Sequence, residues 1–171
     1  MLSFHIFDRK GKTLYTKRYT NTNNTNEDDI ELLSEQRKLI FGMLFSLREL
    51  VGSLIPEESP NKGLHSIRTG ASTLHNYETL SGLRFALFTS NDVRSDRLNH
   101  TSSSSSSKKN QGASVREALQ HIYSDLWVDC VIRSPLYRVD GIGEGNSSFD
   151  IQSTNFEKKL EEYFSTMSWF K

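Results

Sequence analysis

Residues 2–8 alternate between apolar and polar side chains, and this period of two predicts a β-strand. The pattern is broken only by Phe7, which indicates a strand covered on both faces. Residues 13–19, rich in β-branched and aromatic side chains, predict a second strand. Turn-forming residues at 8–11 separate the two, and Gly11 is free to adopt a positive φ. The chain therefore begins with a hairpin.

Apolar residues then recur at helical spacing over residues 34–54. One predicted stripe consists of Ile40, Met43, Leu47, Leu50 and Leu54. Further apolar residues widen it, namely Phe41, Leu44, Phe45 and Val51. A helix that is apolar most of the way round is usually buried on more than one side. We therefore expect this helix to contact its own sheet and also a second protein.

Closely spaced turn signals divide the next segment into three predicted strands, at 63–69, 73–78 and 83–89. Two amphipathic helices follow. Ser114 and Glu117 form a capping box at the start of the first, and Thr154 and Glu157 form one at the start of the second. The order β-β-α-β-β-β-α-α predicts an α/β (α+β) fold. Its five-stranded antiparallel sheet would have the long helix across one face.

Three polar segments interrupt these elements, and we expect them to be loop insertions in a single domain over residues 1–171. They lie at about 20–31, 90–112 and 138–148. The second contains six consecutive serines, at 102–107. Such a run is typical of a flexible, disordered spacer. A phosphorylated regulatory loop is the alternative.

The composition argues against several classes of protein. The 21 basic and 21 acidic residues balance, so no charge pattern for binding nucleic acid or an anionic membrane is evident. A single cysteine, Cys130, excludes an internal disulfide framework and suits a reducing compartment. Neither a signal-peptide pattern nor a membrane-spanning apolar run is present. We expect a soluble, cytosolic protein.

A search for catalytic chemistry finds no metal-binding spacing, no nucleophile elbow and no phosphate-binding loop. Two histidine–carboxylate pairs, His75 with Glu78 and His121 with Asp125, could transfer protons, but surface polar contacts are the simpler interpretation. Cys130 lies in an apolar helix and is expected to be a small buried hydrophobe. We predict no catalytic, metal or cofactor-binding residue.

The unusual feature that remains is an excess of apolar and aromatic residues on the predicted helices. A single sheet with three helices is small for covering all of them, and exposed apolar patches mark partner surfaces. The candidate interface residues are Phe41, Phe45, Tyr123 and Trp127.

Four segments carry a resemblance to a known family. They read FHIFDRKGKTLY, LIFGMLFSLRELV, LHNYETLSGLRFALFTS and VREALQHIYSDLWVDCVIRSPL. In this order they are similar to the Bet5-like small subunits, the subunit 1 family of the TRAPP (transport protein particle) complex, within the sedlin–sybindin superfamily. The likeness extends over nearly the whole chain, and the departures fall in the three predicted loops.

This resemblance implies a longin-like (profilin-like) fold and a role in vesicle transport from the endoplasmic reticulum to the Golgi. The implied partners are other TRAPP subunits and, through the assembled complex, an early-secretory Rab GTPase whose nucleotide exchange the complex promotes. The implied location is cytoplasmic, peripheral at endoplasmic reticulum and cis-Golgi membranes. No catalytic residue is implied for the chain alone. The polar residues Arg48 and Glu49, at the edge of the apolar helix, are the candidates to face the Rab.

Two other trafficking classes share the fold, an adaptor small chain and the longin domain of a SNARE. A SNARE would need a long heptad helix after the domain, and residues 149–171 are too few for one. An adaptor chain has the fold but different motifs. Within the TRAPP interpretation, we expect Met43 and Leu47 to matter for folding, and Phe41 and Phe45 more for assembly.

Overall fold

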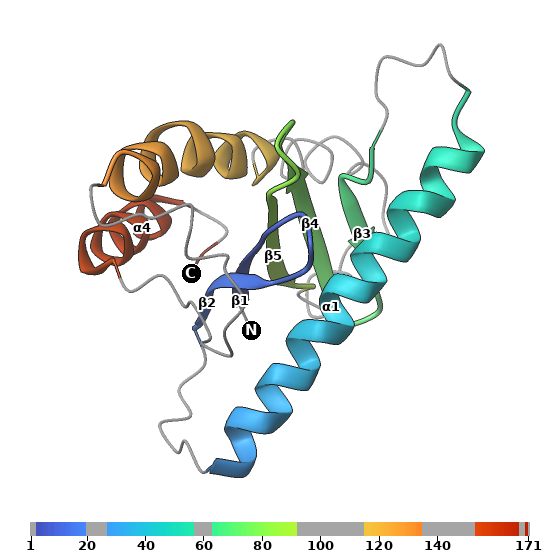
Figure 1. The fold of residues 1–171 in the computed structure, drawn as a ribbon, viewed down its shortest axis with the longest axis horizontal. Coiled ribbons are helices and arrows are strands. Elements are labelled where there is room, and N and C mark those ends of the chain that lie inside the picture. The colour runs from blue at the N-terminus through green and yellow to red at the C-terminus, as the bar shows by residue number, and fades with distance from the viewer. Residues whose placement is uncertain are drawn as a thin grey trace, which may run out of the picture.

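Five antiparallel strands form one sheet in the order β2-β1-β5-β4-β3 (Figure 1). The strands are β1 (Ser3–Phe7), β2 (Thr13–Arg18), β3 (Ser66–Arg68), β4 (Ser72–Glu78) and β5 (Arg84–Ser90). The computed structural model describes residues 3–19, 27–56, 63–91, 115–134, 153–167 and 170. The predicted hairpin and the predicted antiparallel meander are both confirmed, with β1 and β5 joining them.

Helices cover both faces of this sheet (Figure 1). The long helix α1 (Glu27–Leu54) crosses one face. The other face carries α4 (Thr154–Thr166) and a helix that starts with an α-helical segment at 115–121 and continues as η1 (Ile122–Ile132). The order of elements agrees with the predicted β-β-α-β-β-β-α-α and with a longin-like α/β fold.

Strand β1 lies between two hydrophobic cores, as the interruption of its alternation at Phe7 predicts. Phe4 and Ile6 point into the core formed with η1 and α4. Phe7 points to the opposite side, where it packs in a smaller core with Leu44 of α1. Because consecutive strand residues face opposite sides, one short apolar strand serves both layers.

The helix η1 differs from the ordinary α-helix that the sequence predicts. Its hydrogen bonds are of the π type, and at its end the Arg133 amide donates to the Val128 carbonyl at 2.9 Å. The wider turn places Trp127, five residues after Ile122, in the core. Leu126, which the α-helical pattern puts in line with Ile122, is only partly buried.

Several predicted boundaries are wrong. Strand β3 comprises only Ser66–Arg68, shorter than the strand predicted at 63–69. Helix α1 begins at Glu27, so residues 27–31 are helical and not part of a loop. The polar, low-complexity composition of residues 20–31 favours a loop over the whole segment, and residues 20–26 lie outside the described residues. The N-cap of α4 is Ser153 and not Thr154, because the Ser153 hydroxyl accepts a hydrogen bond from the Phe156 amide at 3.2 Å.

Several predictions lie outside the described residues. They include the Ser114 cap, the serine run and the loop at 138–148. Of the segment at 90–112, only Ser90, which ends β5, and Asn91 are described. In the part of the chain that the structure describes, no helix is long and apolar enough to cross a membrane.

Candidate interaction surface

Three separate motifs of the sequence meet at one end of the sheet. These are the β1–β2 turn, the middle of α1 and the β4–β5 turn. Gly11, with φ of +89°, lies so close to α1 that a Cβ atom would be 2.6 Å from Cε1 of Phe41. Gly82, with φ of +84°, lies equally close to the β1–β2 turn. A Cβ atom at Gly82 would be 2.7 Å from the Cβ atom of Arg9. Only glycine allows both turns to approach this closely.

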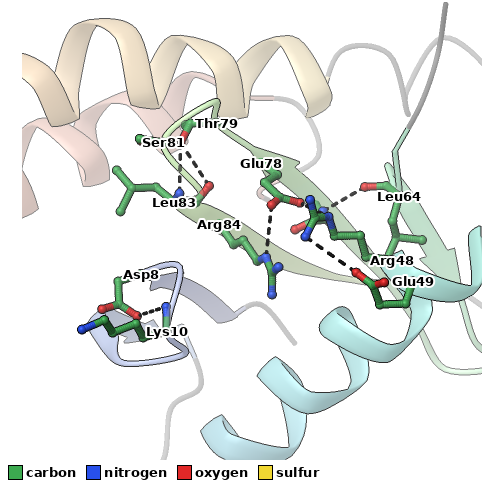
Figure 2. A network of polar contacts seen from close by, with 11 residues as sticks. Asp8, Lys10, Arg48, Glu49, Leu64, Glu78, Thr79, Ser81, Leu83 and Arg84 are labelled. Atoms are coloured by element: carbon green, nitrogen blue, oxygen red, sulfur yellow. Dashed lines mark hydrogen bonds and ion pairs between the residues drawn. The ribbon is translucent and has the colours of Figure 1, made fainter. Parts of the chain in front are cut away.

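Side-chain hydrogen bonds fix both turns (Figure 2). The Asp8 carboxylate accepts from the backbone amides of Lys10 and Lys12, at 2.8 and 2.7 Å. The Thr79 hydroxyl accepts from the Leu83 amide at 3.0 Å. The second turn therefore closes tightly, and the residues on either side of it, Glu78 and Arg84, are direct cross-strand partners.

An ion-pair cluster joins these two residues to α1 (Figure 2). Arg84 is only 3% exposed, and its Nε lies 3.6 Å from Oε1 of Glu78. The other oxygen of Glu78 lies 3.1 Å from Nε of Arg48. A looser contact of 3.9 Å links Arg48 to Glu49 on the same helix. Two guanidinium groups thus share the Glu78 carboxylate.

Two aromatic rings of α1 cover the buried arginine. Its Cζ atom lies 4.9 Å from the centroid of Phe41 and 5.7 Å from that of Phe45, within the range of cation–π attraction. The two rings are stacked on each other at 6.4 Å. Phe41 is partly buried against Phe7, whereas Phe45 is 47% exposed. We call this region the Arg84 surface, comprising Phe41, Phe45, Arg48, Glu49, Glu78 and Arg84.

The structure brings together four of the six predicted interaction residues. Phe41, Phe45, Arg48 and Glu49 all belong to the Arg84 surface. Tyr123 and Trp127 lie on the opposite side of the sheet. Tyr123 is partly buried against the rings of Tyr77 and Phe85.

Trp127 has no surface to offer a partner in this chain. It is fully buried, with Phe85 and Phe156 at 5.9 and 5.5 Å in edge-to-face contacts. Its size and its place on an apolar helix suggested an interface, but the five-residue step of the π-type winding turns it into the core.

Helix α1 has two apolar stripes, whereas its spacing of apolar residues predicts a single broad one. The inner stripe packs on the sheet through Ile40 and Leu44, with Leu47 and Val51 partly buried along it. The outer stripe is exposed and follows a spacing of seven and four residues: Leu32, Leu39, Met43, Leu50 and Leu54. Met43, which was expected to matter for folding, therefore lies on the exposed side of the helix together with Leu50 and Leu54.

The structure brings together one of the two predicted histidine–carboxylate pairs. His75 and Glu78 lie three residues apart on β4 and so point to opposite faces of the sheet. His75 instead hydrogen-bonds the Thr89 hydroxyl at 3.0 Å, and burial lowers its pKa. The His121 ring and the Asp125 carboxylate are in contact, exposed on the helix at 115–132. Cys130 is buried, as predicted.

Sequence reasoning missed Glu78 and Arg84 as members of the surface. Arg84 lies within the apolar run LRFALFT, a pattern that predicts a strand and no interaction site. A signal was nonetheless present, because the predicted turn at Ser81–Gly82 implies a cross-strand neighbour for each residue flanking it. A basic residue at the start of an apolar strand, facing an acidic one across a turn, predicts an ion pair.

Comparison with known proteins supports the resemblance that the motifs predict. The model of the Sybindin-like family matches residues 1–105. Trafficking protein particle complex subunit BET5 of Saccharomyces cerevisiae is 31% identical over 172 residues, covering 96% of both chains. Trafficking protein particle complex subunit 1 of Dictyostelium discoideum is 30% identical and covers 80% of each chain. The Homo sapiens protein of that name is 27% identical, covering 98% of this chain and 94% of its own. The chain thus belongs to the Sybindin-like family.

Proposed function

We propose that this protein is an architectural subunit of a TRAPP complex that acts in vesicle transport between the endoplasmic reticulum and the Golgi. The relatives that match nearly its full length are named as subunits of the trafficking protein particle complex. Their similarity supports one longin-like domain over residues 1–171. On this proposal the protein is cytoplasmic, reaches membranes as a peripheral component of the complex and has no catalytic activity alone.

The observation that carries this proposal is the outer stripe of α1. Its five large apolar residues extend over 22 residue steps, about 33 Å of helix. Exposed large apolar residues that recur along one side of a helix over this length are typical of a protein–protein interface. The stripe is a surface on which a sister subunit could pack, while the inner stripe remains on the sheet.

The Arg84 surface would extend this contact at the flank of the helix. Phe45 is the exposed aromatic residue there, and Arg48 and Glu49 form its charged rim, with side chains 46% and 65% exposed. A polar, solvated rim suits a partner that binds reversibly. We propose that a Rab GTPase binds there, on a surface shared with neighbouring subunits. The assembly would promote exchange by binding the nucleotide-free Rab more tightly than the loaded form.

Co-expression with sister TRAPP subunits, followed by size-exclusion chromatography, tests this proposal. Replacing Leu39 and Leu50 with glutamate places two charges on the outer stripe, so this variant should fail to co-elute with the other subunits. The matched control is Leu80→Glu, at an exposed apolar position in the β4–β5 turn that does not belong to the outer stripe. Co-elution of both variants would contradict docking through α1. Unchanged exchange activity by a complex that lacks the protein would contradict the contribution to exchange.

A further inference from the structure

Arg84 has an unsatisfied hydrogen-bonding group. Its Nη1 atom is buried and has no hydrogen-bond partner among the described residues. The Glu78 carboxylate lies 3.6 Å from Nε and makes no hydrogen bond to Nη1. A buried cation with a missing acceptor is costly, and a native structure usually has a reason to keep one.

Arg48 competes for the same acceptor. Its Nε is nearer to Glu78, at 3.1 Å, and its side chain is far more exposed than that of Arg84. The other acidic residue nearby is Glu49, whose contact of 3.9 Å with Arg48 is long and open to solvent. The cluster therefore holds two guanidinium groups and only one closely placed carboxylate.

We propose that an acidic side chain of a partner protein binds Arg48 and that Glu78 then moves from Arg48 to Arg84. Arg48 is the accessible member of the cluster and can receive the incoming carboxylate as a bidentate partner. The released Glu78 can then approach the neighbouring guanidinium and accept from Nη1. The arrangement makes Arg48 the binding residue and Arg84 a positioning residue that never touches the partner.

The partner that we assign is the Rab GTPase, so this inference rests on the proposed function. The carboxylate would arrive beside Phe45 at the polar rim, whereas the apolar outer stripe lies on another side of α1. Charged contacts at a rim set association rate and selectivity, which suits a partner that binds and leaves.

The test uses the reconstituted complex and measures the affinity of the nucleotide-free early-secretory Rab for it. Arg48→Met should weaken binding by about tenfold or more and reduce its salt dependence. Arg84→Met should weaken binding by roughly threefold to tenfold, because Glu78 then has no second cation to move to. The double variant should bind the Rab no more weakly than Arg48→Met alone. Both substitutions prevent the same event, which is the movement of Glu78 when a carboxylate binds Arg48.

Glu78→Gln keeps the shape of the side chain and removes its charge, so it should tighten Rab binding and abolish the effect of Arg84→Met. If Arg84→Met does not fold, the Rab affinity of Glu78→Gln alone still tests the proposal, and unchanged or weaker binding would contradict it. Arg133→Met serves as the control. It removes an exposed arginine, paired with Asp129 on the other side of the sheet, and should leave binding unchanged.

If the loss of Rab affinity in the double variant equals the product of the losses in Arg48→Met and Arg84→Met, the two residues act independently. That result would overturn the proposed movement of Glu78 from Arg48 to Arg84. Weakened subunit assembly with unchanged Rab affinity in Arg48→Met would assign the carboxylate to a sister subunit, which overturns the choice of partner. The proposed function fails separately, if the wild-type protein does not assemble with TRAPP subunits at all.

Discussion

The guanidinium of Arg84 lies 4.9 Å from the centroid of the Phe41 ring, so a strand and a helix far apart in sequence share a buried cation–π contact. Phe41 in turn packs against Gly11 of the first hairpin. Three of the four segments that carry the family resemblance are therefore in physical contact. A change in any of them should alter the position of the ion-pair cluster.

The first prediction concerns the stability of this cluster. Arg84→Met should change the free energy of unfolding by less than about 1 kcal/mol, because an apolar side chain of similar length fills the site and no buried charge remains. Glu78→Ala should lower it by about 3 kcal/mol, because Arg84 then stays buried without a counter-charge. Urea denaturation followed by circular dichroism measures both. A larger loss for Arg84→Met than for Glu78→Ala would contradict this account.

The second prediction concerns two glycines of contrasting environment. Gly11→Ala should destabilise the protein by about 2 kcal/mol, because it places a Cβ into the Phe41 ring at a positive φ. Gly42→Ala, within α1 and with nothing within 4 Å of the added Cβ, should stabilise it by roughly 0.5–1 kcal/mol. Thermal unfolding of the two variants provides the comparison. Destabilisation by Gly42→Ala would show that this part of α1 is more constrained than its surroundings indicate.

A third prediction follows from His5, which is buried on the α1 side of the sheet. Its ring nitrogens lie 3.2 Å from the hydroxyl oxygens of Ser3 and Thr16. Burial, and then the positive charges of Arg18 and Arg37, lower its pKa from 6.5 to about 4. At a pH between these two pKa values, His5 is protonated in the unfolded chain but stays neutral in the folded chain.

Stability should therefore fall as the pH falls from about 6.5 to about 4, with His5 contributing a loss of about 3 kcal/mol over that range. His5→Gln can retain hydrogen bonds to the two hydroxyls but cannot be protonated. Its free energy of unfolding should depend less steeply on pH than that of the wild type, in urea titrations from pH 7 to pH 4. Equal slopes would contradict the assignment.

The strands could be predicted because period-two alternation and turn residues report local geometry directly. The two cores on either side of β1 were also foreseeable, from Phe7 alone. The side of α1 that faces the sheet could not be predicted, because two sides of the helix carry apolar residues at helical spacing. Periodicity shows that an apolar stripe exists, but it does not show which of two stripes faces the sheet.

The candidate surface was foreseeable only in part for a related reason. Phe41, Phe45 and Arg48 are prominent on the helix, but the buried cation that joins them comes from a strand 36 residues after Arg48. Such a contact depends on how α1 crosses the sheet, which is set by side-chain packing and not by local sequence. Trp127 was misplaced because π-type winding is not visible in a pattern read at 3.6 residues per turn.

The last prediction separates the two stripes of α1. Leu44 is fully buried in the core with Phe7, so Leu44→Ala should lower the free energy of unfolding by about 2–4 kcal/mol. Met43, its neighbour on the outer stripe, is exposed, and Met43→Ala should cost less than about 0.5 kcal/mol. Assembly should show the opposite dependence on the two residues. In co-elution with sister subunits, the folded Leu44→Ala protein should assemble normally, whereas Met43→Glu should not. If Met43→Ala instead unfolds the isolated protein while Leu44→Ala is tolerated, the inner and outer stripes have been exchanged, and the docking surface on α1 must be reassigned.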